Sequence, residues 1–117
     1  MSIEFQPFEN ERPWGSFRQF CKNTIATVKI LTLKSNQMIS LQSHAKREEF
    51  WRVIAGYGVA EIGHEKREIK IGDEMFIPLG TKHRLIADTD GLEIMEISTG
   101  DFDENDIIRY EDKYGRL

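Results

Sequence analysis

Two short segments of the sequence carry four side chains whose types and spacing suit a divalent metal ion. The first segment supplies Gln42, His44 and Glu49, and the second, a series of glycine and proline turns, ends at His83. Residues two apart on a strand face the same side of a sheet, so Gln42 and His44 are expected to point the same way. Amide, imidazole and carboxylate ligands suit zinc, manganese, iron, cobalt or nickel without selecting one of them. The sequence therefore predicts a site for one divalent ion, whereas the remaining histidine, His64, is expected on the surface in a hairpin turn.

The residues around these segments form short apolar stretches separated by turn-forming residues. Punctuation by glycine, proline, asparagine and aspartate is typical of an all-β sandwich or barrel. Four ligands that come from three strand ends can converge only where a sheet closes on itself, so we expect a small barrel. The expected strands span residues 25–34, 38–42, 49–55, 59–62, 67–71, 75–77, 83–87 and 92–98.

The composition limits the class of protein. A chain of 117 residues is long enough for one hydrophobic core and too short for two, so we expect one domain over residues 1–117. The formal net charge of -4 and the lack of a basic stripe argue against nucleic-acid binding. No apolar stretch approaches the roughly 20 residues that a membrane-spanning helix needs, and the N-terminal segment has no secretory signal. With a single cysteine, Cys21, and no internal disulfide, the expected location is the cytoplasm.

The two ends of the chain differ from its central part. We expect an N-terminal arm over residues 1–22, in which Trp14 packs on the barrel, and the barrel itself over residues 23–100. The tail, residues 101–117, starts with an acidic run over residues 101–106 that suits the positive end of a helix. The sequence therefore predicts a short C-terminal helix through residues 107–110.

The two metal-site segments resemble the two sequence motifs of the cupin family. The first motif departs at two positions, with Asn36 in place of a glycine and Gln42 in place of a histidine, and the second has Ala87 in place of its terminal asparagine. The matching positions are His44, Glu49 and Gly56 in the first motif and Gly72, Pro78, Gly80 and His83 in the second. The resemblance implies a double-stranded β-helix, or jelly-roll, barrel.

Most of the chain further resembles the C-terminal cupin domain of type II mannose-6-phosphate isomerases. The segments that carry this resemblance keep their order and comprise residues 12–16, 39–44, 47–51, 80–84 and 106–116. The chain departs from the family where Ala45 and Lys46 replace a run of histidines and where Phe50 replaces a histidine. In the family this domain usually follows a guanylyltransferase domain. Because these 117 residues contain no glycine-rich nucleotide loop, we do not expect them to transfer a nucleotidyl group.

The resemblance implies a metal-dependent isomerase that interconverts mannose 6-phosphate and fructose 6-phosphate. It places the metal on Gln42, His44, Glu49 and His83, since isomerases of the other type also use a Gln-x-His pair. Such a reaction moves a proton between C2 and C1 of the sugar through a cis-enediol. Lys46 and Glu49 are the candidates for the group that carries this proton.

Several cations are candidates for binding the phosphate of a small phosphosugar. Arginine presents a planar fork that matches phosphate geometry, and Arg47 ranks first because the family has an arginine two residues before its glutamate. The other candidates are Lys82, Arg84 and Arg109, and Trp51 is a candidate for stacking on the sugar or for plain core packing.

Two alternatives to the isomerase stay open, together with the oligomeric state. The chain could be a non-catalytic cupin that binds a sugar or a nucleotide-sugar, or another metallo-cupin enzyme such as an oxygenase or epimerase. The resemblance implies a homodimer, since small cupins with N-terminal arms commonly pair, and unpaired edge strands favour pairing physically.

Overall fold

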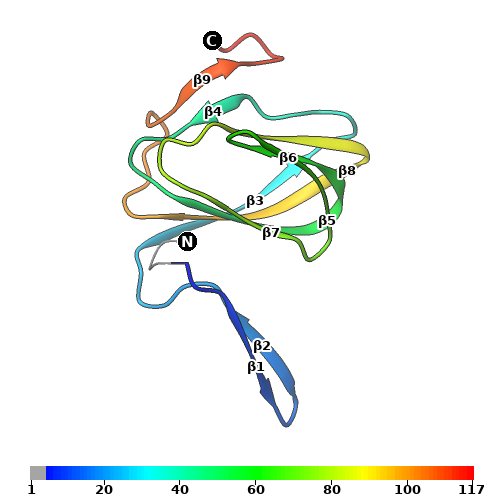
Figure 1. The fold of residues 1–117 in the computed structure, drawn as a ribbon, viewed down its shortest axis with the longest axis vertical. Helices are drawn as coiled ribbons and strands as arrows, with labels where there is room; N and C mark the ends of the chain where they lie inside the picture. The colour runs from blue at the N-terminus through cyan, green and yellow to red at the C-terminus, as the bar shows by residue number, and fades with distance from the viewer. Residues whose placement is uncertain (1–4) are drawn as a thin grey trace.

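The computed structural model describes residues 5–117 and shows nine β-strands, with none of these residues in a helix (Figure 1). The strands are β1 Phe8–Arg12, β2 Gly15–Gln19, β3 Ala26–Leu33, β4 Leu41–Ser43, β5 Glu49–Ile62, β6 Glu65–Lys70, β7 Glu74–Ile77, β8 His83–Thr99 and β9 Ile108–Glu111. The all-β prediction is confirmed. Within residues 5–117 there is accordingly no helix that could span a membrane.

Seven of the strands form one antiparallel sheet that curls around a common interior (Figure 1). The two long strands carry the arrangement, because β5 pairs with β6, β7 and β8, and β8 also pairs with β3 and β4. β9 extends the sheet on the far side of β4. The register sets Glu49 opposite Ser98 at one end of the β5–β8 ladder and Ile62 opposite His83 at the other, and His83 also lies opposite Gln42 of β4.

Two of the turns expected between predicted strands, those over residues 56–58 and 88–91, are bends inside these long strands. β5 runs through Gly56 with a φ of 79°, and β8 runs through Gly91 with a φ of 76°. A Cβ on Gly56 would lie 2.1 Å from the carbonyl oxygen of Gly91, so only glycine lets the two backbones approach this closely. The strands predicted over residues 49–55 and 59–62 are therefore one strand, as are those predicted over residues 83–87 and 92–98.

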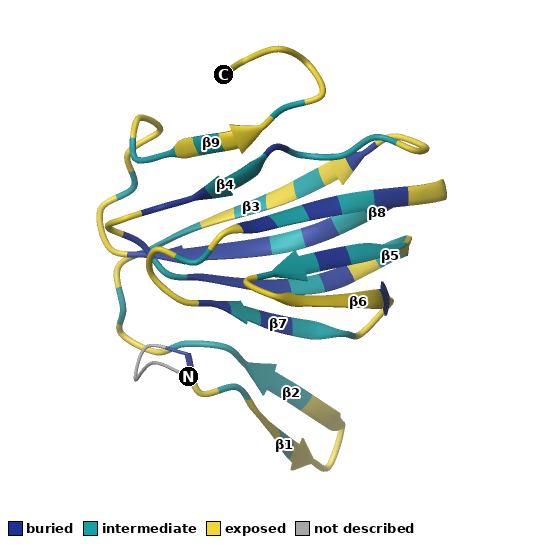
Figure 2. Cartoon of the chain, turned by 45° about the horizontal axis from the view of Figure 1, so that its top comes forward, coloured by how far each residue is buried: buried dark blue, intermediate teal, exposed yellow. Residues whose placement is uncertain are grey.

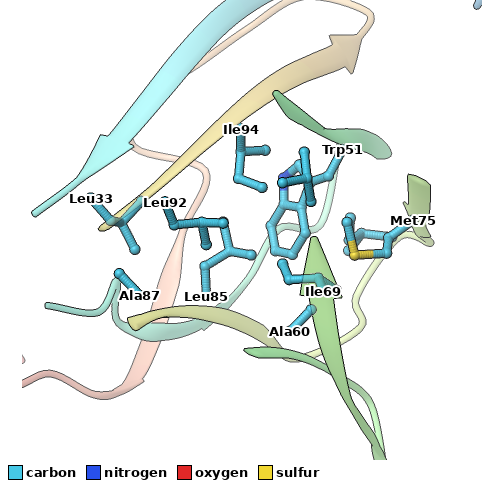
Figure 3. Packing of buried hydrophobic residues seen from close by; sticks show 11 residues of the cluster. Leu33, Trp51, Ala60, Ile69, Met75, Leu85, Ala87, Leu92 and Ile94 are labelled. Atoms are coloured by element: carbon cyan, nitrogen blue, oxygen red, sulfur yellow. The ribbon is translucent and has the colours of Figure 1, made fainter. Parts of the chain in front are cut away.

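The hydrophobic core fills the barrel interior beside the metal-site segments (Figure 3). Alternate residues of β8 point inward, and Leu85 and Ile94 are completely buried against Trp51 of β5. A second apolar group lies on the outer face of the sheet, where Phe5 stacks on Phe50 with ring centroids 5.5 Å apart. Buried residues are accordingly concentrated in β5 and β8, and burial falls off toward both chain ends (Figure 2).

The predicted C-terminal helix is wrong, because the tail forms β9 and pairs with β4. Asp106 does not begin a helix; its carboxylate accepts hydrogen bonds of 2.9 Å from the backbone N–H groups of Ala45 and Lys46. Those donors belong to the loop before β5, so the acidic run is fixed by the barrel rather than by the residues that follow it. The following Ile108 and Tyr110 have side chains that favour strands.

The prediction that Trp14 packs on the barrel is also wrong. The arm is a hairpin of β1 and β2 that projects away from the barrel (Figure 1). Trp14 lies in the tight turn between the paired residues Arg12 and Gly15 and is 74% exposed. At its other end, Arg18 ties the hairpin to the barrel by an ion pair of 2.6 Å with Glu74 of β7.

Candidate metal centre

Three potential metal ligands, His44, Glu49 and His83, converge in the barrel interior and are called the ligand cluster below. Glu49 begins β5, His83 begins β8 and His44 follows β4, so each stands where a strand meets a turn. Glu49 Oε1 lies 3.3 Å from His83 Nε2 and 3.7 Å from His44 Nε2. Ligands bound about 2.1 Å from one ion are themselves roughly 3.0–3.5 Å apart, so these separations suit a shared ion.

Both imidazoles of the ligand cluster are fixed by backbone carbonyl groups. His44 Nδ1–H donates to the carbonyl of Asp106 at 2.7 Å, and His83 Nδ1–H donates to that of Thr81 at 2.8 Å. With the proton on Nδ1, Nε2 of the neutral ring keeps a lone pair. Burial lowers the pKa of His44, although the nearby Glu49 carboxylate opposes this, and the neutral ring is favoured. Imidazoles that bind metals are commonly oriented in this way.

The atoms that face one another are left without hydrogen-bond partners. Glu49 Oε1 and His83 Nε2 lie 3.3 Å apart, and each is fully buried and unpaired within the described part of the chain. Burial acts to raise the pKa of Glu49, but neighbouring His83, His44 and Arg47 lower it to about 2. This point of the barrel therefore attracts positive charge, and the donor set of two imidazole nitrogens and one carboxylate oxygen fits a divalent metal ion.

Gln42 lies at the edge of the ligand cluster. Its side chain is on the same side as that of His44, as expected, and its amide nitrogen is 3.3 Å from His44 Nε2. Its amide oxygen instead accepts a hydrogen bond of 2.6 Å from Ser40 Oγ. Only the oxygen of a neutral amide is a metal ligand, so Gln42 would bind after turning its amide over.

Arg47 and residues 101–106 close the barrel over the ligand cluster. The Arg47 side chain is 7% exposed, and its Nε donates to Glu49 Oε2 at 3.2 Å while Nη2 donates to His44 Nε2 at 3.3 Å. Its Nη1 donates to the carbonyl of Asp103 at 3.0 Å, and the ring of Phe102 lies 4.2 Å from the guanidinium carbon. Arg47 is thus part of the buried polar network.

The sequence of this chain matches a known family. Residues 4–112 match the family described as mannose-6-phosphate isomerase C-terminal. The chain belongs to that family. Among curated relatives, it is 34% identical over 110 residues to the mannose-1-phosphate guanylyltransferase ManC of Salmonella typhimurium, covering 91% of this chain and 22% of that protein. It is 37% identical over 107 residues to the xanthan biosynthesis protein XanB of Xanthomonas campestris, covering 90% and 23%. The chain therefore spans less than a quarter of these relatives.

Solved structures share the fold of this chain. Oxalate decarboxylase from Bacillus subtilis matches with a TM-score of 0.68 at 24% identity, over 74% of this chain and 24% of that one. That enzyme has Mn(II) centres. The structural neighbours are cupins, so the predicted cupin fold is confirmed.

Three of the candidate residues lie away from the ligand cluster in this family member. The Lys46 side chain is exposed, and the Lys82 ammonium lies 4.2 Å from the ring centroid of Tyr110. Arg84 forms ion pairs with Glu111 at 2.9 Å and Glu61 at 4.0 Å. Lys82 and Arg84 therefore interact with other side chains of the barrel, and Lys46 is exposed to solvent.

Arg109 differs from these cations because it combines a buried, unpaired guanidinium nitrogen with the lack of any ion pair among the described residues. The register of β4 and β9 sets Arg109 opposite Gln42, and directly opposed residues share a face of the sheet. Its Nε is fully buried without a hydrogen-bond partner, and Arg109 makes no ion pair within residues 5–117. Leaving a guanidinium nitrogen buried and unpaired is costly, so Arg109 is a cation available to an anion beside the ligand cluster.

Glu96, a buried carboxyl group on the inner face of β8, is not among the site residues predicted from the sequence. Its Oε2 accepts a hydrogen bond of 3.1 Å from Trp51 Nε1, and Trp51 is 0% exposed, which leaves the indole no surface for a sugar. Strand alternation carries the signal that could have revealed Glu96. Because Leu92 and Ile94 face the core, Glu96 shares their side of the strand, whereas Glu93 does not.

Proposed function

We propose that this domain is a metal-dependent sugar-phosphate isomerase that interconverts mannose 6-phosphate and fructose 6-phosphate. The observation that carries the proposal is the convergence of three buried ligand atoms, from His44, Glu49 and His83, on one point of the barrel. Arg109, a cation without an acidic partner, is on the same face, as a phosphorylated substrate requires. The family to which the chain belongs is consistent with this reaction class.

The ligand cluster would hold one divalent ion, with Gln42 as a fourth ligand once its amide oxygen faces inward. Zinc, manganese, cobalt, nickel and iron all accept this mixture of imidazole, carboxylate and amide. When bound, such an ion polarises the carbonyl of a sugar and stabilises negative charge on its oxygen. The carbonyl groups of Asp106 and Thr81 keep both imidazoles in the orientation that this needs.

Two arginines divide the recognition of the sugar phosphate in this proposal. Arg109 binds the phosphate, because its guanidinium has no competing acid. Arg47 uses three of its five N–H donors on Glu49, His44 and Asp103, so it contacts a sugar oxygen with those that remain. This assignment reverses the order expected from the sequence, in which Arg47 ranked first for the phosphate.

Access to the ligand cluster depends on residues 101–106. The three ligands are at most 2% exposed, and Phe102 and Asp103 lie against Arg47 above them. A sugar phosphate therefore enters when this segment moves away and reacts when it returns, which excludes water from the reacting carbons.

A binding role without catalysis is the second candidate. The relatives ManC and XanB are much longer than this chain, and ManC is a guanylyltransferase, so the domain could hold a sugar phosphate or nucleotide-sugar for a reaction performed elsewhere. The closed state of the ligand cluster favours this reading over an oxygenase or epimerase, which the fold alone also permits.

We also propose that the protein forms a homodimer. Trp14 at the tip of the hairpin is 74% exposed, and on β3, which pairs only with β8 in the described region, Val28 and Ile30 are 61% and 63% exposed. An apolar edge strand and a projecting aromatic side chain are both stabilised by a second copy of the chain.

A coupled assay for fructose 6-phosphate distinguishes the two functions. Protein reconstituted with each metal is supplied with mannose 6-phosphate, and calorimetry on the same samples records binding. Turnover supports the isomerase. Binding of mannose 6-phosphate without turnover, at full metal occupancy, contradicts it and supports the binding role.

A further inference from the structure

Glu96 is a second carboxyl group on the barrel wall that carries the ligand cluster. It lies on β8 opposite Trp51, two residues before Ser98, whose hydroxyl donates to Glu49 Oε2 at 3.3 Å. Residues two apart on a strand share a face, so Glu96 and Ser98 both point into the interior. Glu96 is 6% exposed. The two carboxyl groups therefore line one interior, on adjacent strands.

The surroundings of Glu96 do not neutralise it. Its hydrogen bond comes from the neutral indole of Trp51, and no cation within residues 5–117 forms an ion pair with it. Lys29, which is opposite Glu96 on β3, pairs with Glu104 at 3.2 Å and lies 3.9 Å from the ring centroid of Phe102. If Glu96 only oriented Trp51, a neutral hydrogen-bond acceptor would serve the same purpose without the free-energy cost of burying an ionisable group.

The other candidates for proton transfer are unsuited to it in this structure. Glu49 Oε1 faces the two imidazoles, where the metal ion would bind, and its Oε2 accepts from Arg47 and Ser98, so neither oxygen is available to take a proton from the sugar. Lys46 is exposed to solvent, outside the barrel interior. Glu96 is left as an interior carboxyl group with an oxygen that makes no hydrogen bond among the described residues.

The charges around the two carboxyl groups separate their proton affinities. Burial, followed by the negative charge of Glu49, raises the pKa of Glu96 to about 7, against the opposing effects of Trp51, Lys29 and Arg47. The pKa of Glu49 moves the other way, to about 2. When the surroundings of two neighbouring carboxyl groups shift their pKa values in opposite directions, one group commonly serves as a fixed anion and the other as an acid–base group.

We propose that Glu96 is the catalytic acid–base group that carries the proton between C2 and C1 of the sugar phosphate, an inference that rests on the proposed isomerase function. The Glu96 carboxylate takes the proton from C2 of the aldose, and the electrons of the C2–H bond form the C1=C2 double bond as the π electrons of the C1 carbonyl move to O1, which gives an enediolate. The Glu96 carboxylic acid then returns the proton to C1, and the O2 hydroxyl proton passes to O1 as the C2 carbonyl forms. Atoms and electrons balance without any oxidant or reductant.

The test compares Glu96→Gln with wild type, using mannose 6-phosphate deuterated at C2. Glutamine keeps an acceptor for Trp51 but cannot exchange protons. We expect kcat and loss of deuterium to water, followed by NMR, to fall roughly 100- to 10,000-fold. Metal content and affinity for the sugar phosphate should stay within threefold of wild type. Glu93→Gln, on the other face of β8, is the control and should behave as wild type.

Each outcome separates this inference from the proposed function. An active wild type whose Glu96→Gln variant exchanges deuterium within threefold of the wild-type rate overturns the role of Glu96 alone. A metal-loaded wild type with neither turnover nor exchange overturns the isomerase and this inference together. If Glu96→Gln shows no thermal unfolding transition, Glu96→Asp replaces it; shortening the side chain should lower kcat at least tenfold at unchanged affinity, and an unchanged kcat overturns the inference.

Discussion

The barrel interior and the β1–β2 hairpin place their side chains in opposite ways. In the interior, the polar groups of His44, Glu49 and His83 are at most 2% exposed. On the hairpin, the apolar side chains of Trp14 and Phe8 are 74% and 41% exposed. A buried polar atom without a partner and an exposed aromatic ring are each unfavourable alone. Both regions therefore indicate a partner from outside the chain, a small charged ligand in one case and a protein surface in the other.

The largest expected effect is the loss of metal when both imidazoles are removed. We expect about one divalent ion per wild-type chain and none in a His44→Ala, His83→Ala double variant, because only glutamine and glutamate ligands would remain. Elemental analysis after reconstitution and gel filtration measures this. His64→Ala is the matched control, since His64 is exposed in the turn between β5 and β6. A wild type that retains no zinc, manganese, cobalt or nickel would contradict the prediction that the buried polar groups of the barrel interior bind a metal ion.

A second prediction concerns the pH dependence of stability. Glu96 has a pKa of about 7 in the fold against 4.5 for an unperturbed carboxyl, so its contribution to stability is complete below pH 4.5 and is lost as the pH rises through 7. We expect metal-stripped wild type to lose about 3 kcal/mol relative to Glu96→Gln between pH 4.5 and 8. Urea unfolding at both pH values measures it. Parallel pH profiles for the two proteins would show that Glu96 is ionised throughout.

A third prediction tests the anion-binding role of Arg109. Arg109→Ala should weaken mannose 6-phosphate binding roughly ten- to a hundredfold, because a charge-assisted pair worth about 1.5–3 kcal/mol is removed. Metal content should not change, since Arg109 is not a ligand. Arg67→Ala, on the exposed strand β6, is the control for loss of one positive charge. Calorimetry that gives equal affinities for Arg109→Ala and Arg67→Ala would remove Arg109 from the site.

The smallest effect is expected on the hairpin. Trp14→Ser should weaken the homodimer about tenfold, because large aromatic side chains carry much of the energy of protein interfaces. Tyr57→Ser, which changes another aromatic residue that is 54% exposed, should leave the dimer intact. Analytical ultracentrifugation gives both dissociation constants. A wild type that is monomeric at micromolar concentration would contradict the homodimer and show that the exposed Trp14 does not bind a second copy of the chain.

The ligand cluster could be predicted from the sequence because its positions are set by local rules. Glycine and proline turns fix where the strands begin, so Glu49 and His83 were expected at the positions that they occupy. The conformation of the tail could not be predicted in this way. Asp106 has the chemistry of a helix cap, but its partners, the N–H groups of Ala45 and Lys46, are distant in sequence and come near only in the folded barrel.

The ranking of the cations failed for a similar reason. Arg47 and Arg109 have the same side chain, and only the fold shows that Glu49, His44 and Asp103 surround the first while the second has no acid beside it. Partner choice among charged groups depends on long-range pairing of strands, which no local pattern encodes. The projection of Trp14 likewise depends on where the hairpin leaves the barrel rather than on the residues of its turn.

The central claim, that the ligand cluster makes this domain a metal-dependent isomerase, is tested most directly by titrating metal-free protein with one divalent ion while following fructose 6-phosphate formation. We expect no activity without metal, a linear rise with added ion and a plateau at about one equivalent per chain. Activity that is already complete in metal-free protein, or that stays absent at full occupancy with every ion tested, would contradict it.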